Sequence, residues 1–430
     1  MELYEHQVKA LEKTKDKNRV AYFHDMGLGK TFTGAEKMKQ LGGRVNLVVC
    51  QKSKVDDWVE HFRKYYPFRL HDNPVIITED LTNEQCLKEY AERANSFDEN
   101  IVLIGVINYD LIIRRPELLQ IKYNTIMLDE SSMIKNDTAK RTKAILKMKT
   151  DNAILLSGTP TGGKYEELYS QLKLLGWKIT KADYWKEYIK THKIRVGGFT
   201  LPIVTGYKNI GGLKRKMREH GCHFLKTSEV FDLPAQTYTE IKVAAPPEYQ
   251  AFVKNELAEI DGDLFVGDTV LKKLLFAREI CGAYAPNKIK ALSDLIESTA
   301  DRLIIFYNFN IELEKIRRLC MEYKRPFSQV NGTVKDLNAY ETKPDSITAI
   351  QYQSGAMGLN LQKANKIIYF SPPLSSELFE QSKKRIHRIG QKHPCFYYQL
   401  ICKNTVETKI YNTLEKRQDY TELLFKKGGF

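Results

Sequence analysis

The chain has 430 residues, of which 42% are hydrophobic and 28% are charged, so it belongs to the globular rather than the disordered class. Its length predicts roughly two to three domains. A formal net charge of +14 indicates a polyanionic partner, most often nucleic acid. The seven cysteines include no CxxC pair, which argues against a disulfide framework. Neither a signal-peptide pattern nor a membrane-length apolar run is evident, so we expect a cytoplasmic protein without a membrane partner.

The first 160 residues alternate short apolar runs with longer amphipathic stretches. This alternation predicts a parallel sheet covered by helices on both faces, and therefore an α/β fold. The expected strands are residues 44–50, 101–107, 123–128 and 153–156. Two of the expected helices are residues 54–65 and 138–149.

The alternation stops after residue 160 and resumes near residue 286. We expect residues 1–160 to form a first lobe, 161–235 a helical, basic insert and junction, 236–285 a helical segment, and 286–430 a second lobe. The insert has a Gly-rich interruption at 195–212 and a basic cluster at 214–218. The strands and the final helix expected in the second lobe are residues 303–307, 347–352, 366–370, 396–400 and 405–422.

A glycine-rich string follows the first short apolar run and precedes a helix. Gly27 and Gly29 allow the backbone N–H groups to face an anion at the positive end of that helix. Lys30 would reach the β- and γ-phosphates of a nucleotide, and Thr31 would hold Mg²⁺ through its hydroxyl. The usual first glycine of this pattern is replaced by His24. The residues expected to bind ATP here are Met26, Gly27, Leu28, Gly29, Lys30 and Thr31.

Two further motifs follow apolar strands. Asp129 would bind Mg²⁺, and Glu130 would orient and deprotonate the attacking water. Ser157 and Thr159, in the string SGTP, would sense the γ-phosphate and couple its loss to nearby helices. We therefore expect ATP and Mg²⁺ as cofactors, with Lys30, Asp129 and Glu130 as catalytic residues.

The closing string QSKKRIHRIGQ, residues 381–391, resembles the corresponding motif of Swi/Snf-type DNA translocases in helicase superfamily two. The resemblance implies two RecA-like lobes and an ATP-driven motor on double-stranded DNA, with single-stranded DNA as a further candidate partner. By the same resemblance, Arg385 and Arg388 reach the ATP and act in catalysis, and Gln381 takes part in coupling. Stabilising arginines of this kind contribute about 10³–10⁵ in rate in related chemistry.

Other segments resemble the family in the same order along the chain. Gln7 matches the residue that reads adenine, and Gly358 lies in a motif that contacts nucleotide and DNA backbone. Trp58 follows the first DNA-backbone motif. The residues expected to bind nucleic acid are Lys52, Ser53, Asn108, Tyr109, Ser354 and Asn360.

The chain departs from its relatives in reading DESS at 129–132, where DEAH is common, so Ser132 lacks an imidazole that often couples this loop to the other lobe. It has no room for large appendages, so it resembles a minimal phage or bacterial motor, monomeric in solution and placed in the host cytoplasm if phage-encoded. Two alternatives stay open: a strand-separating DNA or RNA helicase, and a nucleic-acid-binding scaffold that does not hydrolyse ATP.

Overall fold

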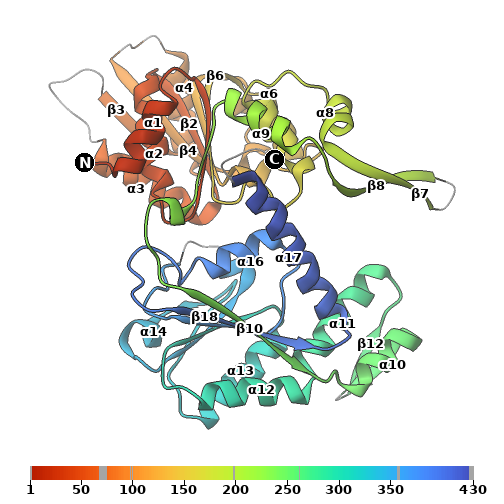
Figure 1. Ribbon diagram of the computed structural model, residues 1–430. Coiled ribbons are helices and arrows are strands. Elements are labelled where there is room, and N and C mark those ends of the chain that lie inside the picture. The colour runs from red at the N-terminus through yellow and green to blue at the C-terminus, as the bar shows by residue number, and fades with distance from the viewer. Residues whose placement is uncertain are drawn as a thin grey trace. The chain divides into compact units, whose positions relative to one another are not determined.

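The computed structural model describes residues 2–66, 75–96, 98, 100–196, 199–260, 262–355 and 359–425. Its contacts separate two compact units, and we call Met1–Val230 lobe 1 and Phe231–Asp419 lobe 2. Each lobe is built on a seven-stranded sheet (Figure 1). Within the part of the chain that is described, no helix combines the length and the apolar character needed to cross a bilayer.

The sheet of lobe 1 is parallel throughout, as the alternation of strands and helices predicts. All four strands expected from the sequence are present; the strand expected at 44–50 begins one residue later, and the other three are longer than expected. In sheet order the strands are β3 (Val75–Asp80), β4 (Ile101–Asn108), β2 (Val45–Cys50), β5 (Lys122–Asp129), β6 (Lys149–Ser157), β1 (Arg19–His24) and β9 (Cys222–Leu225).

Side chains alternate between two apolar layers, one on each face of this sheet. In β1, Val20 and Tyr22 belong to one buried cluster, whereas Ala21 and Phe23 belong to the other. The first face is covered by α1 (Glu5–Lys13), α2 (Lys30–Leu41) and α3 (Val55–Tyr65). The second is covered by α4 (Glu84–Asn95), α6 (Lys140–Lys147), α7 (Tyr169–Leu174) and α9 (Ile210–Glu219).

The segment after residue 160 contains a β-ribbon where the sequence analysis expects mostly helix. Helices α7, α8 (Lys181–Tyr188) and α9 are present, but β7 (Ile189–Val196) and β8 (Phe199–Tyr207) pair as an antiparallel ribbon. The sequence signal is two runs rich in β-branched and aromatic residues on either side of a Gly-Gly pair, which favours a hairpin. Figure 1 shows β7 and β8 extending away from the lobe 1 sheet.

The sheet of lobe 2 is parallel except at one edge, where β14 and β15 pair antiparallel. All four strands expected here are present. Residues 236–243 also form a strand, although a helical segment was expected, because they pair in parallel with β18 along its whole length. The order is β10 (Gln236–Val243), β18 (Cys395–Cys402), β17 (Lys366–Tyr369), β13 (Leu303–Tyr307), β16 (Ile347–Gln351), β14 (Phe327–Val330) and β15 (Lys335–Asp336).

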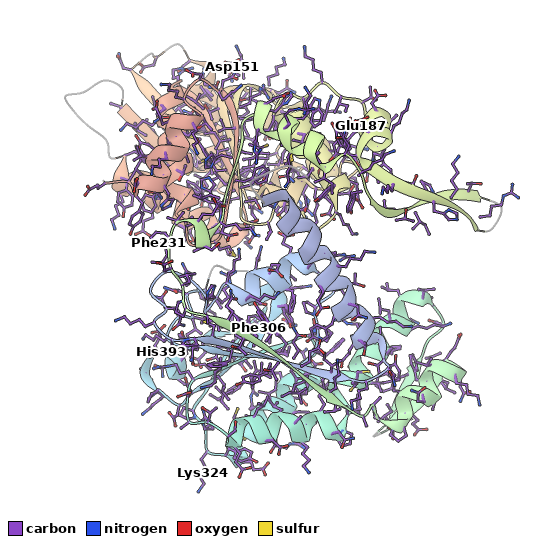
Figure 2. All side chains as sticks on the ribbon, in the orientation of Figure 1. Asp151, Glu187, Phe231, Phe306, Lys324 and His393 are labelled. Carbon is purple, nitrogen blue, oxygen red and sulfur yellow. The ribbon has the colours of Figure 1, made fainter. Side chains whose placement is uncertain are left out.

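Helices cover both faces of the second sheet as well. Phe306, on the central strand β13, lies in the interior of lobe 2, whereas Lys324 and His393 lie at its periphery (Figure 2). The fold-class prediction of two α/β lobes is thus confirmed. The helices of lobe 2 are α10 (Pro247–Asn255), α11 (Val270–Ala283), α12 (Pro286–Glu297), α13 (Asn310–Glu322), α14 (Asn338–Thr342), α15 (Tyr352–Gly355), α16 (Ser376–Lys383) and α17 (Val406–Phe425); a small ribbon is formed by β11 (Leu257–Ile260) and β12 (Asp263–Val266).

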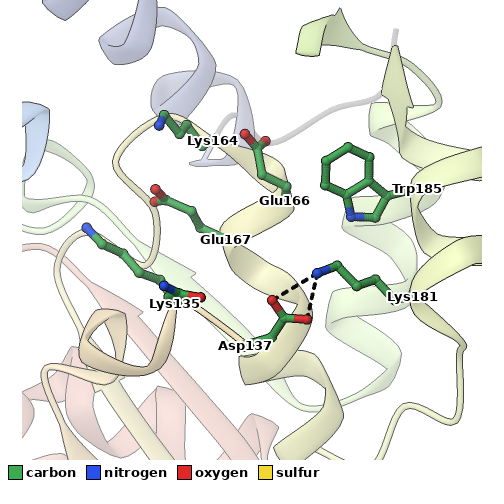
Figure 3. A pocket seen from close by; sticks show the side chains of 8 residues that line it. Lys135, Asp137, Lys164, Glu166, Glu167, Lys181 and Trp185 are labelled. Atoms are coloured by element: carbon green, nitrogen blue, oxygen red, sulfur yellow. Dashed lines mark hydrogen bonds and ion pairs between the residues drawn. The ribbon is translucent and has the colours of Figure 1, made fainter. Parts of the chain in front are cut away.

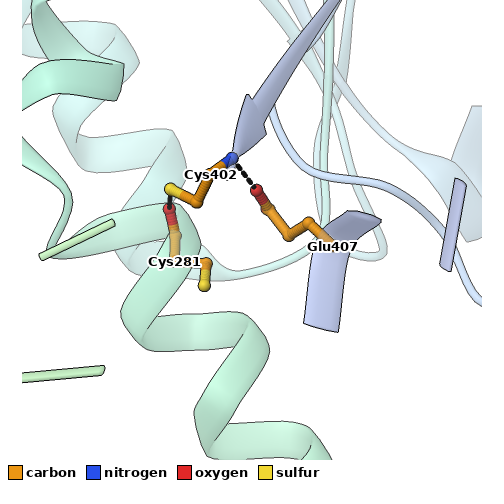
Figure 4. A group of neighbouring side chains, drawn as sticks. All are labelled: Cys281, Cys402 and Glu407. Atoms are coloured by element: carbon orange, nitrogen blue, oxygen red, sulfur yellow. Dashed lines mark hydrogen bonds between the residues drawn. The ribbon is translucent and has the colours of Figure 1, made fainter. Parts of the chain in front are cut away.

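A buried ion pair ties three elements of lobe 2 together. Lys288 of α12 pairs with Glu407 at the start of α17, and both side chains are 0% exposed. The other carboxylate oxygen of Glu407 accepts the backbone N–H of Cys402 at 2.9 Å. Figure 4 shows Cys281 and Cys402 beside this carboxylate, with the Cys402 thiol donating to the Cys281 carbonyl at 3.5 Å. Burial raises the pKa of the Cys281 thiol, which favours a neutral Cys281 thiol packed beside a satisfied carboxylate.

This pair makes a testable prediction about lobe 2. Lys288→Met leaves the Glu407 carboxylate buried without its cation, which is expected to cost lobe 2 about 3–5 kcal/mol of unfolding free energy. The three tryptophans, at positions 58, 177 and 185, all lie in lobe 1. In a urea titration we therefore expect the circular-dichroism transition of lobe 2 to move while tryptophan fluorescence, which follows lobe 1, keeps its midpoint.

A second substitution serves as the control for this prediction. Glu407→Gln in the Lys288→Met background removes the unpaired charge and keeps an acceptor for the Cys402 N–H, so it should restore part of the lost stability. Identical dichroism transitions in Lys288→Met and the unchanged protein would show that the pair does not stabilise lobe 2.

Candidate functional site

The parallel sheet of lobe 1 brings three separate motifs to one edge. Strands β5, β6 and β1 are neighbours, and their carboxyl ends point the same way. The register pairs Phe23 with Ser157, and Asp129 with Leu156. The loops that follow these three strands therefore start side by side, in the position where open α/β sheets bind ligands.

The glycine-rich loop after β1 has the backbone that its sequence predicts. Gly27 and Gly29 have φ values of 89° and 69°, in the left-handed region that favours glycine. Gly29 caps the N-terminus of α2, where unpaired N–H groups and the helix dipole attract an anion. The Lys30 ammonium donates to the carbonyls of His24 at 3.0 Å and Asp25 at 3.2 Å, so it lies folded against the loop.

Gln7 ties helix α1 to this loop. Its side-chain amide donates to the Gly29 carbonyl at 3.1 Å, and its side-chain oxygen accepts the backbone N–H of Tyr4 at 2.9 Å. A Cβ at position 29 would come within 2.3 Å of the Gln7 side-chain nitrogen, so any other residue there would displace the Gln7 amide from its bond to the loop. The predicted adenine-reading residue and the predicted phosphate loop are thus in direct contact.

The Asp129 carboxylate accepts a hydrogen bond from the indole of Trp58. The Trp58 Nε1–H donates to Asp129 Oδ2 at 2.8 Å, and the Trp58 ring is buried. Burial raises the pKa of the Asp129 carboxyl, whereas the Trp58 hydrogen bond and the charge of Lys30 lower it. Trp58 follows the expected DNA-backbone motif in the sequence, and in the structure its indole orients the Asp129 carboxylate.

The donor set at this edge fits Mg²⁺. Thr31 lies in the first turn of α2 and Asp129 at the end of β5, so the available ligands are a hydroxyl and a carboxylate oxygen. Mg²⁺ prefers hard oxygen ligands and is commonly held by one or two carboxylates together with substrate phosphates. The residues present therefore suit the metal that the sequence predicts.

Glu130 is fixed by Ser157 from the neighbouring strand. The Ser157 hydroxyl donates to Glu130 Oε1 at 2.6 Å, and the Thr159 N–H donates to the Ser157 oxygen at 3.1 Å. Glu130 itself has φ 58°, a left-handed conformation that is costly for a residue with a Cβ and is found mostly where function requires it. Three residues predicted from two separate strings, Glu130 from one and Ser157 and Thr159 from the other, thus form one hydrogen-bonded chain.

Gln171 extends this chain and was missed by the sequence analysis. Its side-chain oxygen accepts from the Ser131 hydroxyl at 2.8 Å, and its nitrogen donates to the Pro160 carbonyl at 2.7 Å. It therefore links the loop after β5 to the loop after β6 from helix α7. The sequence offers little signal for it, because an interior glutamine on an apolar helix has no distinctive spacing.

His24 replaces the usual first glycine of the loop and forms a second contact that sequence alone did not suggest. Its Nε2 lies 2.8 Å from Nδ1 of His223 on the neighbouring strand β9. Burial lowers the pKa of His24 well below its ordinary value, and the neighbouring charges of His223 and Lys30 act in the same direction, so the His24 ring is neutral. A buried imidazole in the β1–β9 layer thus anchors the start of the loop.

Of the residues of lobe 1 that are expected to contact nucleic acid, two are exposed and two are buried. Lys52 and Ser53, after β2, are exposed. Asn108, the last residue of β4, and Tyr109, which follows it, are both buried. The Tyr109 hydroxyl donates to the carbonyls of Asp129 at 2.9 Å and Glu130 at 3.3 Å. The Tyr109 ring is therefore enclosed, and it supports the turn that carries the two carboxylates, while its contact with nucleic acid stays a prediction.

Lobe 2 carries the remaining predicted residues. Gln381 is buried on α16, Ser354 is buried on α15, and Asn360 is exposed. Arg385 and Arg388 lie on the turn after α16. Burial lowers the pKa of the Arg388 guanidinium. Gly358 lies outside the described residues.

The side chain of Gln391, the last residue of the HRIGQ string, forms hydrogen bonds with the backbone around it. The Gln391 amide nitrogen donates to the carbonyls of Ala364 at 2.9 Å and Ile386 at 3.2 Å, and its oxygen accepts the N–H groups of Lys392 and His393 at 3.0 Å. Gly390 has φ 95°, which favours glycine. These bonds stabilise the turn that carries Arg385 and Arg388, which explains why the string ends in Gly-Gln.

Comparison with known proteins agrees with this arrangement. Residues 7–227, more than half of the chain, match the SNF2-related domain, and residues 287–390 match the helicase conserved C-terminal domain. The chain is 23% identical over 417 residues to the SWI/SNF-related matrix-associated actin-dependent regulator of chromatin subfamily A-like protein 1 of Xenopus laevis, covering 93% of this chain and 41% of that one. An uncharacterized ATP-dependent helicase of Mycoplasma genitalium is 22% identical, with 92% and 39% covered.

Among solved structures, the Sulfolobus solfataricus SWI2/SNF2 ATPase core in complex with dsDNA is 22% identical, with 98% of this chain and 93% of that chain covered and a TM-score of 0.45. The chain spans about two fifths of the length of the two curated relatives. On the match over more than half of its length, the chain belongs to the SNF2-related, Swi/Snf-type family of helicase-like proteins.

Proposed function

We propose that this protein is an ATP-hydrolysing motor that moves along double-stranded DNA. The observation that carries the proposal is the meeting of Lys30, Asp129 and Glu130 at one edge of the lobe 1 sheet, in a chain of the SNF2-related family. Each of these groups has a distinct task in phosphoryl transfer, and together they match its requirements.

The side chains divide the chemistry among them. Lys30 would leave its two carbonyl acceptors for the β- and γ-phosphates, which are stronger, charged acceptors. Mg²⁺ bound by Thr31 and Asp129 would neutralise charge on the same phosphates. Glu130, held by Ser157, would accept a proton from the attacking water. Loss of the γ-phosphate would then alter the Glu130–Ser157–Thr159 chain, which supports the coupling role proposed for Ser157 and Thr159.

Lobe 2 would complete the site when ATP is bound. We propose that Arg385 and Arg388 stabilise the charge that develops on the transferring phosphoryl group, and that Gln381 takes part in coupling. Closing on ATP and opening after hydrolysis would move the two lobes against the DNA backbone. Lys52, Ser53 and Asn360, all exposed, are the proposed backbone contacts.

Double-stranded DNA is proposed as the track because the chain has a large positive charge and belongs to the SNF2-related family. A net charge of +14 favours binding to phosphates without sequence preference. A strand-separating helicase would use the same ATP site. A scaffold would not need a Glu130 held in a strained conformation beside Ser157, which argues against that alternative.

The Trp58–Asp129 hydrogen bond gives a pH-dependent prediction. Asp129 must be ionised to hold Mg²⁺, so activity falls as the pH drops through its pKa. Trp58→Phe removes the N–H donor that lowers this pKa. We expect the acid limb of the ATPase pH profile to move to higher pH, because losing a hydrogen bond to the ionised carboxylate raises the Asp129 pKa.

Trp177→Phe is the matched control, because it removes an indole from the same lobe away from Asp129. Its acid limb should coincide with that of the unchanged protein. The role assigned to Trp58 fails if both variants give the same pH profile as the unchanged protein, or if both shift equally.

Two DNA substrates, a triplex and a forked duplex, distinguish translocation along the duplex from separation of its strands. We expect the protein with ATP to displace the third strand of a DNA triplex, because a motor that follows the duplex removes what lies in its groove. We expect no opening of a forked duplex under the same conditions. A non-hydrolysable ATP analogue should abolish triplex displacement. Fork opening without triplex displacement would instead identify a helicase.

A further inference from the structure

The ribbon of β7 and β8 concentrates positive charge. From Ile189 to Arg218 the sequence has eight Lys or Arg residues and no Asp or Glu. These 30 residues therefore supply +8 of the chain's formal net charge of +14. Lys190, Lys193 and Arg195 lie on β7 of the projecting ribbon (Figure 1), and most of the other cations lie on helix α9. Neither strand of the ribbon carries an acidic residue, unlike the mixed charges of an ordinary solvated surface.

The register places two of these charges on one face of the ribbon. Lys193 pairs with Pro202, and Arg195 pairs with Thr200. Because side chains alternate along a strand and paired residues share a face, these four positions project from the same side. Lys193 and Arg195 are exposed and are separated by about 7 Å along the strand.

Within the described residues, the cations of the ribbon have no acidic partner. Among the described residues, Lys190, Lys193 and Arg195 form no ion pair within 4.0 Å. On the neighbouring helix α9, by contrast, Arg215 and Lys216 both face Glu219, at 3.9 Å and 2.8 Å. The ribbon therefore offers cations to an external partner, whereas part of the α9 charge is already compensated.

The base of the ribbon is held firmly in lobe 1. The Tyr207 ring stacks on Tyr165 with centroids 4.3 Å apart, and its hydroxyl donates to Glu166 at 3.0 Å. Figure 3 shows Glu166 beside Trp185 and the Lys181–Asp137 ion pair, around a cavity of about 360 Å³.

This base is continuous with the loop that carries the SGTP string. The Tyr207 hydroxyl also lies 3.4 Å from the Gly163 carbonyl, three residues after Pro160. Gln171, which binds the Pro160 carbonyl, reaches back to Ser131 next to Glu130. Hydrogen bonds and a short stretch of backbone therefore connect the base of the ribbon to the loop that carries Glu130.

We propose that the basic face of the β7–β8 ribbon, centred on Lys193 and Arg195, binds the phosphate backbone of double-stranded DNA. This inference rests on the proposed function, because it names an element that grips the track. A two-stranded ribbon has the dimensions of the major groove, and Lys, Arg and Thr side chains bind phosphates without reading sequence. The contact serves a motor that must pass every sequence.

Salt dependence tests this inference directly. Each phosphate contact contributes about 0.9 to the slope of log affinity against log salt on duplex DNA, so Lys193→Gln with Arg195→Gln should reduce the slope by about 1.8. The affinity loss should be the same for duplexes of different sequence. ATP hydrolysis without DNA should stay unchanged, because neither residue belongs to the ATP site.

Lys122→Gln with Lys149→Gln is the matched control. These two exposed lysines are neighbours on adjacent strands, and they lie at the amino ends of β5 and β6, the opposite edge from the predicted ATP site. The control removes the same charge and should leave the slope unchanged.

Two outcomes overturn the inference in distinguishable ways. If the unchanged protein binds duplex DNA with a steep salt slope and the ribbon variant keeps that slope, the ribbon proposal is wrong while the motor proposal stands. If the unchanged protein has no affinity for duplex DNA at low salt, both proposals fall. Unchanged tryptophan fluorescence in the ribbon variant would exclude unfolding of lobe 1 as the cause of a lost slope.

Discussion

The alignment of β1, β5 and β6 is the constraint on which the rest of lobe 1 depends. Their parallel register places the phosphate loop, the Asp129–Glu130 pair and Ser157 at one edge, although more than 100 residues separate Lys30 from Ser157. A slip of one residue would turn every side chain to the opposite face. Two apolar layers, one on each face, hold the register because they require the observed alternation of buried side chains.

Hydrogen bonds then orient what the sheet brings together. Trp58 holds Asp129, Ser157 holds Glu130, and Gln171 joins the loops behind them. The same solution appears in lobe 2, where Gln391 binds carbonyls and N–H groups around the turn of Arg385 and Arg388. In both lobes a neutral side chain satisfies buried backbone or carboxylate groups next to the charged side chains of the predicted site.

The sequence predicts the features that depend on local pattern. Apolar runs predict the eight expected strands, and the string from Gly27 to Thr31 predicts a loop that needs left-handed glycines. Contacts between distant segments leave no such pattern: neither the pairing of His24 with His223 nor the link through Gln171 could be read from spacing. The β7–β8 ribbon was missed because basic residues and glycines masked its β-branched alternation. Burial of Tyr109 was missed because family resemblance specifies position and not the direction of a side chain.

The central claim is that the edge of the lobe 1 sheet binds and hydrolyses ATP. The most direct test compares the ATP hydrolysis rates, with and without duplex DNA, of the unchanged protein, Lys30→Ala and Lys39→Ala, which removes an exposed lysine from the same helix. We expect duplex DNA to stimulate the unchanged protein and Lys39→Ala equally, and Lys30→Ala to lose about 10²-fold or more in rate. Equal rates in all three proteins would contradict the account.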